Sequence, residues 1–139
     1  MSRKKQDIYL GGEGTNIELR AVADLVSFGT ELDAELKKVE KEMAEKTLRE
    51  IRQESSQFNK YGSGKYARGW GITKQGGYVI HNTVYQLPHL LEYPHPIIAY
   101  GKQVAYWSGK AHIKPVEKKM NEEFQQKVDE MIDKGIDKL

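Results

Sequence analysis

The sequence predicts an α+β fold in which a small antiparallel sheet packs against two long amphipathic helices. Residues 30–54 and 115–134 carry apolar side chains at helical spacing, with charged residues on their other faces. Between them, two short runs of aromatic and β-branched residues flank a Gly-rich turn, the pattern of a hairpin. Because 139 residues suffice for one modest core, we expect a single domain over residues 17–139.

The N-terminal region is predicted to begin with a flexible arm. Residues 1–16 are charged and then Gly-rich, a composition that favours turns over packing. Residues 17–20 alternate and predict a short strand, and residues 21–28 fit a short helix that Gly29 ends. The first residues include basic side chains but no apolar stretch behind them, so we expect no signal peptide.

The first long helix is predicted to begin at Thr30, a good N-cap residue. It extends to about residue 54, giving a length of about 36 Å. Oppositely charged residues lie four apart on its polar faces, as in Glu42 and Lys46. A coiled-coil partner is one use of its apolar stripe, but we expect the stripe to pack on the sheet. The stripe consists of Leu32, Leu36, Val39, Met43, Leu48 and Ile51.

Two strands are predicted after this helix. Residues 55–64 are polar and end the helix, and residues 68–74 and 78–82 then have the composition of strands. Gln75-Gly76-Gly77 between them is typical of a short hairpin turn. We therefore expect these two strands to pair in an antiparallel manner.

Prolines divide the segment that follows the second strand. Residues 83–93 fit a short helix with Pro88 in its first turn. Pro94 and Pro96 prevent its continuation and open a loop to residue 112, which is longer than most structureless connections. Two interpretations stay open: the loop contains a hairpin that turns at Gly101-Lys102-Gln103, or it is a functional arm.

The C-terminal segment shows the clearest helical pattern. Pro115 lies at its start, and Gly135 is expected to end it and leave residues 136–139 frayed. The apolar residues that recur at every fourth position predict one buried face. They are Val116, Met120, Phe124, Val128 and Ile132.

Positive charge is concentrated in the middle of the chain. Residues 55–115 contain seven basic side chains and a single acidic one, Glu92, interleaved with tyrosines and tryptophans. Proteins that bind single-stranded nucleic acids use this mixture, but Tyr and Trp are also enriched at protein interfaces. We favour an interface, because no nucleic-acid-binding motif is recognisable. The candidate contacts for either kind of partner are Lys65, Arg68, Lys102, Tyr106, Trp107 and Lys110.

No catalytic, cofactor or metal site is expected. The chain has no cysteine, and its four histidines lack the His-Glu-x-x-His spacing of zinc enzymes. Gly-Ser-Gly-Lys at residues 62–65 lacks the first Gly and the final Ser or Thr of a phosphate-binding loop. No apolar run approaches the roughly 18 residues of a membrane span. We therefore expect neither an enzyme nor a membrane protein.

Glu92 is expected to have a structural role. A general acid–base mechanism with two carboxylates is not indicated, because no second acid lies in residues 55–115. We predict that Glu92 pairs with Arg68, Lys65 or a histidine.

Particular residues between positions 81 and 115 resemble one protein family. The chain contains Leu91-Glu92-Tyr93-Pro94-His95 and, after a loop, Ala111-His112-Ile113-Lys114-Pro115. This combination resembles the head–tail joining, or tail-completion, proteins of long-tailed bacteriophages. In that family a strand ending near an Asn precedes a short Tyr-containing helix, a Leu-Glu-aromatic-Gly-His element, a loop and a His-Ile-x-Pro signature. The matching positions are Asn82, Tyr85, His89, Leu91, Glu92, His95, His112, Ile113 and Pro115.

The resemblance covers residues 17–135 in element order, with its specific letters in residues 64–115. The chief departure is Pro94, where relatives have Gly. Gly can adopt a positive φ and Pro cannot, so the turn after Tyr93 must be built differently.

The resemblance implies a virion structural protein at the neck, made in the bacterial cytoplasm, that completes the tail and joins it to the head. Its implied partners are the connector or stopper, the tail terminator or tail tube, and further copies of itself in a ring, six-fold as in other tail proteins. The family has no catalytic residues to transfer. The basic middle segment would allow nonspecific contact with the genome. The alternative function is a small nucleic-acid-binding module that uses residues 55–115.

Overall fold

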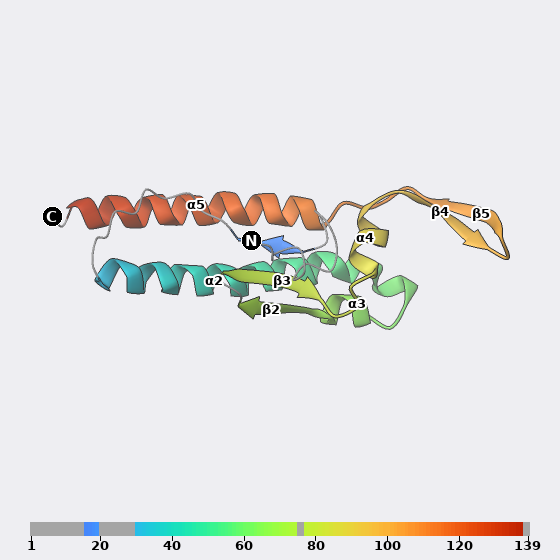
Figure 1. Ribbon diagram of the computed structural model, residues 1–139, viewed down its shortest axis with the longest axis horizontal. Helices are drawn as coiled ribbons and strands as arrows, with labels where there is room; N and C mark the ends of the chain where they lie inside the picture. The colour runs from blue at the N-terminus through green and yellow to red at the C-terminus, as the bar shows by residue number, and fades with distance from the viewer. Residues whose placement is uncertain (1–15, 20–29, 75–76, 138–139) are drawn as a thin grey trace, which may run out of the picture.

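Two long antiparallel helices lie side by side, with a small sheet beside them and a two-stranded hairpin extending from one end (Figure 1). The computed structural model describes residues 16–19, 30–74 and 77–137. The predicted helix at residues 21–28 and nearly all of the predicted flexible arm lie outside the described residues. The elements are β1 (Ile17–Glu18), α2 (Thr30–Ser55), the 3-10 helix η1 (Ser56–Tyr61), α3 (Lys65–Arg68), β2 (Trp70–Lys74), β3 (Tyr78–Asn82), α4 (Leu87–Glu92), β4 (His95–Ala99), β5 (Lys102–Trp107) and α5 (Ile113–Asp137).

The predicted α+β class is confirmed, and α2 packs on the helix α5 as well as on the sheet. Its apolar stripe buries Met43 and Ile51 in a core shared with Met120 and Phe124 of α5. The same helix also contacts β2 and β3. The expectation that the stripe packs on the sheet was therefore incomplete, because much of it packs against the antiparallel helix α5.

Helix α5 continues past the residue that was predicted to end it. Gly135 lies within α5, where a β-carbon would come 3.3 Å from Leu32 Cδ1 of α2. This glycine thus permits close packing of two helices instead of stopping one. Among the residues that the structure describes, no helix is both long and apolar enough to cross a membrane.

The three-stranded sheet is antiparallel in the order β1-β3-β2. As predicted, β2 and β3 form a hairpin, with Trp70 paired with Asn82 and Ile72 with Ile80. Strand β2 starts two residues later than expected, because Arg68 belongs to α3. Trp70 is buried, and its indole Nε1 donates a hydrogen bond to Ser55 Oγ at 2.8 Å.

The segment predicted as a polar loop contains η1, which buries Phe58. The Phe58 ring meets Tyr66 edge-on at a centroid distance of 5.8 Å and lies 4.8 Å from the His112 ring. A single apolar residue thus anchors this polar segment to the core.

The loop at residues 94–112 contains a hairpin, and we call residues 95–107, which comprise β4 and β5, the arm. It turns at Tyr100-Gly101, one residue earlier than predicted, so Lys102 and Gln103 belong to β5. The φ angles of Tyr100 and Gly101 are 54° and 74°, and two successive positive values are typical of the type I′ turn of two-residue hairpins. The register shifts between Ile97 and Ile98. The arm projects beyond the ends of both long helices (Figure 1).

We predict that Ser55→Ala lowers the free energy of unfolding by about 1–2 kcal/mol, because the buried indole N–H of Trp70 loses its acceptor. The matched control is Ser56→Ala. Ser56 is exposed and bonds to the carbonyl of Gln53, so its loss should cost no more than about 0.5 kcal/mol. Urea unfolding of both variants tests this, and equal effects would contradict it.

Candidate functional site

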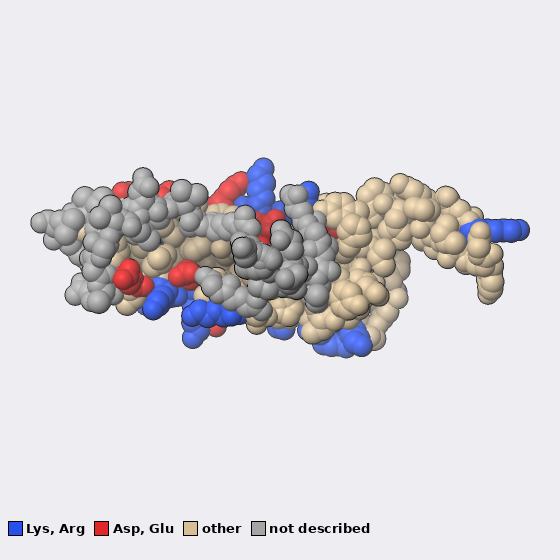
Figure 2. Space-filling model, in the orientation of Figure 1, with Lys and Arg blue, Asp and Glu red and all other residues tan. Residues whose placement is uncertain are grey.

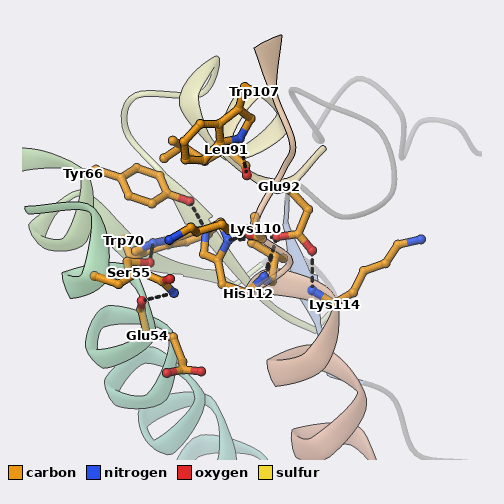
Figure 3. Close-up of polar contacts among 12 residues, drawn as sticks. Glu54, Ser55, Tyr66, Trp70, Leu91, Glu92, Trp107, Lys110, His112 and Lys114 are labelled. Carbon is orange, nitrogen blue, oxygen red and sulfur yellow. Dashed lines mark hydrogen bonds and ion pairs between the residues drawn. The ribbon is translucent and has the colours of Figure 1, made fainter. Parts of the chain in front are cut away.

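The polar groups that fix the arm to the body meet where α3, α4 and α5 converge (Figure 3). We call Tyr66, Asn82, Leu91, Glu92 and His112 the arm-base cluster. Tyr66, Asn82, Glu92 and His112 are buried, and Leu91 is partly buried against the core. Buried polar groups of this kind must form hydrogen bonds with one another, because water does not reach them.

The Glu92 carboxylate, at the end of α4, binds the start of α5. Its Oε1 accepts hydrogen bonds from the backbone N–H groups of His112 at 2.8 Å and Ile113 at 2.9 Å, and its Oε2 accepts one from Lys114 at 3.0 Å. A helix start leaves such donors without partners inside the helix, and its dipole attracts negative charge. Glu92 therefore caps α5 from a distant part of the chain and explains why α5 begins two residues before Pro115.

The surroundings of Glu92 favour its ionised form. Burial alone would raise its pKa, but hydrogen bonds from the His112 side chain and from the three backbone N–H groups lower the pKa below its ordinary value. The cap therefore carries a negative charge at neutral pH.

The His112 ring connects Glu92 to Tyr66. Nδ1 lies 2.8 Å from the Lys110 carbonyl and 2.9 Å from Glu92 Oε1, and both of these are acceptors, which assigns the proton to Nδ1. Burial raises the pKa of the Tyr66 hydroxyl far above its ordinary value, so that hydroxyl stays protonated and donates to His112 Nε2 at 2.7 Å. Each polar atom of the ring thus has a partner.

Asn82 ties the end of β3 to α3. Its Nδ2 donates to the Tyr66 carbonyl at 2.7 Å, and its Oδ1 accepts from Val84 N at 2.9 Å. A β-carbon at Gly69 would lie 2.7 Å from Asn82 Oδ1 and 2.8 Å from Thr83 Oγ1. Only glycine allows the chain to pass this close to the Asn82 side chain.

The two segments that flank the arm are bound to each other at Leu91 and Gly109. The Leu91 carbonyl accepts from Lys110 N at 2.9 Å and from Trp107 Nε1 at 3.1 Å. Gly109 has a φ of 81°, and a β-carbon there would lie 2.9 Å from Pro94 N and 3.0 Å from the carbonyl carbon of Tyr93. The arm therefore leaves the body through a closely packed backbone crossing.

Pro94 is accommodated without a left-handed residue before it. Tyr93 is extended, with φ −114° and ψ 151°, as is favoured before proline. The positive φ of this region lies instead at Gly109, on the returning segment.

The structure brings together some of the sequence-predicted site residues. Asn82, Leu91, Glu92, His112 and the buried Ile113 lie in or beside the arm-base cluster. Four others lie outside it. Tyr85, His89 and Pro115 are exposed, and His95, half-buried at the start of β4, has its Nδ1 3.0 Å from the Pro96 carbonyl.

The predicted contacts for nucleic acid or protein fall into separate groups. Lys65 and Arg68 are exposed on α3, and Lys102, Tyr106 and Lys110 are exposed on the arm and its return. Trp107 is half-buried, packs edge-on against Tyr61 and donates to Leu91, so it is part of the arm base rather than a free surface.

One of the three partners predicted for Glu92, a histidine, is correct. Glu92 pairs with a histidine, His112, and Arg68 instead donates to the Ser63 carbonyl at 3.0 Å. The sequence could not choose among them because the distances depend on how α3 and α4 pack.

Tyr66, Gly69 and Gly109 were not identified from the sequence as site residues. Two of these are glycines required by close approach of backbone or side chains, and nothing in the local sequence separates them from flexible loop glycines. For Tyr66, the aromatic ring within a short polar segment was a usable signal.

The arm-base cluster is suited to fix the position of the arm and not to catalyse group transfer. Its carboxylate and imidazole are occupied by backbone groups and by Tyr66. Within residues 16–19, 30–74 and 77–137, no three His, Asp or Glu side chains lie together as a metal site would require. The cluster fixes the direction of the arm relative to α5.

The chain matches no protein-family model, no curated protein and no solved structure.

We predict that Glu92→Gln lowers the free energy of unfolding by about 2 kcal/mol at neutral pH, because the amide places donors against backbone N–H groups. The folded-state pKa of Glu92 is lowered, so its stabilising effect is full above the ordinary value of 4.5 and is lost as pH falls through the folded value. The difference between the two proteins should shrink in that acidic range.

Urea unfolding from pH 7 to pH 3 measures this difference. Glu122→Gln, an exposed change on α5, serves as the control and should have little effect at any pH. A difference between wild type and Glu92→Gln that does not vary with pH would contradict the cap.

We predict that Gly109→Ala destabilises the protein more than Gly101→Ala does. Both glycines have left-handed φ angles, so both changes should cost about 1 kcal/mol for the backbone conformation. A β-carbon meets nothing within 4 Å at Gly101 but meets backbone atoms at Gly109, which should add about 1–3 kcal/mol. Thermal unfolding of the pair tests this, and equal losses would show that the crossing is looser than described.

Proposed function

We propose that this chain is a phage head–tail joining protein of the tail-completion type, with an assembly role and no catalytic one. The observation that carries the proposal is the arm, an apolar hairpin held rigidly at its base and exposed along its length (Figure 1). Ile98, Val104 and Tyr106 are each 60–61% exposed.

One face of the arm is suited to bind protein. Pro96 pairs with Tyr106, so these two side chains share a face, and Ile98, beyond the register shift, is exposed as well. Exposed apolar patches of this kind mark interaction sites, and tyrosine is enriched among the residues that dominate binding.

The arm is expected to gain stability from a partner. An isolated two-stranded hairpin is marginally stable in water, because it lacks a core on which to pack. Here the hydrogen bonds to Leu91 and the packing of Trp107 hold only the base. A neighbouring subunit would bury the remainder.

The residues that resemble the phage family support the same function. Asn82, Glu92, His112 and Ile113 are among the letters that carry the resemblance, and they lie where the arm joins the body. If proteins of this family use these residues to orient an arm for assembly, the presence of the same residues in this chain needs no catalytic explanation. The partners that we propose are neck and tail proteins and further copies of this chain.

A second candidate function is nonspecific binding to nucleic acid. Lys60, Lys65 and Arg68 are exposed around η1 and α3, beside the exposed ring of Tyr61, and Figure 2 shows basic side chains gathered in this region. Such a surface can contact phosphates while a ring stacks on a base. Binding to single-stranded DNA at ~50 mM salt that weakens steeply as salt rises would favour it.

Deletion of the reading frame from the phage or prophage that carries it tests the proposal. We expect electron microscopy of the lysates to show filled heads beside separate tails. Supplying the intact chain from a plasmid should restore joined particles, whereas supplying Tyr106→Ala should restore fewer, because the apolar face of the arm is reduced.

Glu122→Gln is the control for this complementation. Glu122 is exposed on α5, away from the arm, and its change should leave joining unchanged. Normal joined virions in the deletion strain would refute the neck assignment and favour the nucleic-acid alternative.

A further inference from the structure

The arm is suited to bind through its side chains and not through its strand edges. On β4, Pro96 has no N–H to donate, and the His95 ring Nδ1 lies 3.0 Å from the Pro96 carbonyl. On β5, the register shift leaves Val104 as an extra residue, and Lys102 adds a charge. Prolines, bulges and lysines of this kind keep a further strand from pairing with an edge. A partner therefore meets the faces and the tip of the arm.

The tip of the arm presents a ring that the fold does not use. The Tyr100 side chain has an exposed fraction of 102%, as in an extended peptide. Tyr100 is also the only non-glycine residue with a positive φ in the part of the chain that the structure describes, and the type I′ turn favours Asn, Asp or Gly there. A fully exposed ring on a strained turn residue is suited to enter an apolar pocket on another molecule.

Every exposed charged side chain of Lys, Arg, Asp or Glu between residues 56 and 115 is basic. The only acid of this segment, Glu92, is buried, and its charge is taken up by the start of α5. The exposed basic residues are Lys60, Lys65, Arg68, Lys74, Lys102, Lys110 and Lys114. A surface of one sign favours a partner of the opposite sign.

Both ends of the arm carry this positive charge. Lys102 adjoins the tip and is the only Lys, Arg, Asp or Glu in the arm, and Figure 2 shows the uncharged length of the arm with basic side chains at its tip. At the base, Lys110 donates its N–H to the Leu91 carbonyl, and Lys114 Nζ lies 5.8 Å from the centroid of the Tyr93 ring. The apolar face of the arm thus lies between cations.

The chemistry of the arm favours a different protein as its partner. Nucleic acid needs several cations along its phosphates, and the arm has only Lys102. A lipid bilayer would surround the unpaired backbone groups on the outer edges of a two-stranded sheet, which is costly. A second copy of this chain offers a groove between α2 and α5, but its three glutamates and three lysines leave no net charge to attract Lys102.

We propose that the arm docks in an apolar groove with carboxylates at its rim on a head or tail protein. Tyr100 and the apolar side chains of the arm enter the groove, and Lys102 pairs with an Asp or Glu at the rim. This inference rests on the proposed assembly role of the arm and specifies the chemistry of the surface that receives it.

The first test measures binding to the separate particles that the deletion strain is expected to release. The purified full chain is mixed with tails and, separately, with filled heads, and cosedimentation gives the bound fraction. We expect the chain to bind one of the two, and Lys102→Glu to weaken that binding about tenfold or more, because attraction becomes repulsion. Lys102→Arg keeps the charge and should bind more tightly than Lys102→Glu.

Lys37→Glu is the matched control for this charge reversal. Lys37 is exposed near the start of α2, at the end of the helix pair opposite the arm (Figure 1), so its reversal should leave binding unchanged. Thermal unfolding of each variant checks that it is folded. Equal binding by the wild type and Lys102→Glu would overturn the inference.

The second test identifies the group that Lys102 contacts. A carbodiimide joins a lysine amine to a carboxylate that touches it, and mass spectrometry of the bound complex then locates both residues. We expect Lys102 to be linked to an Asp or Glu of a head or tail protein, and Lys102→Arg to abolish that link because it has no such amine. A link from Lys102 to another copy of this chain, or none in a complex that has formed, would contradict the proposed contact.

The remaining outcomes separate this inference from the neck assignment. Binding to a single-stranded DNA oligonucleotide that Lys102→Glu weakens about tenfold would assign the arm tip to phosphate and overturn the inference. Joined virions in the deletion strain would refute the neck assignment and this inference together. Separate heads and tails that bind Lys102→Glu as tightly as the wild type would refute this inference alone.

Discussion

The contact between the Glu92 carboxylate and the first turn of α5 is the interaction on which the rest of this structure depends. It joins the end of α4 to a helix that starts about twenty residues later, and the chain between them forms the arm. Because Glu92 is buried, its charge is tolerable only with the helix dipole and the donors around it. One carboxylate thus fixes the start of α5 and the point from which the arm leaves.

The second shared element is the hydrogen-bonded chain from Glu92 through His112 to Tyr66. It connects α5 to α3, and Asn82 extends the connection to β3 through the Tyr66 carbonyl. In a buried network each group limits the orientation of the next, since an unpaired polar atom is costly. The base of the arm is therefore rigid, while the apolar side chains along the arm are exposed. This arrangement is expected of a surface that binds a partner after the chain has folded.

Sequence reasoning identified several members of this site but not their contacts. Glu92, His112 and Asn82 were named from a family resemblance, and a histidine was among the partners predicted for Glu92. Gly69 and Gly109 were missed because their roles come from neighbours that only folding supplies. A β-carbon would lie within about 3 Å of the Asn82 and Thr83 side chains at Gly69, and of the Tyr93–Pro94 backbone at Gly109. Arg68 was predicted to lie in a strand and was one of three alternative partners for Glu92, yet it lies in α3 and donates to the Ser63 carbonyl.

Periodicity and turn chemistry, which act over a few neighbouring residues, determined the two long helices, the β2–β3 hairpin and the place of Pro88 in α4. The tertiary structure decided what local patterns cannot encode. Leu32 approaches Gly135 so closely that this glycine serves helix packing instead of helix termination. The turn at Tyr100-Gly101 follows from the β4–β5 register, and the cap on α5 comes from a carboxylate elsewhere in the chain. Each of these depends on distances between segments that only folding brings together.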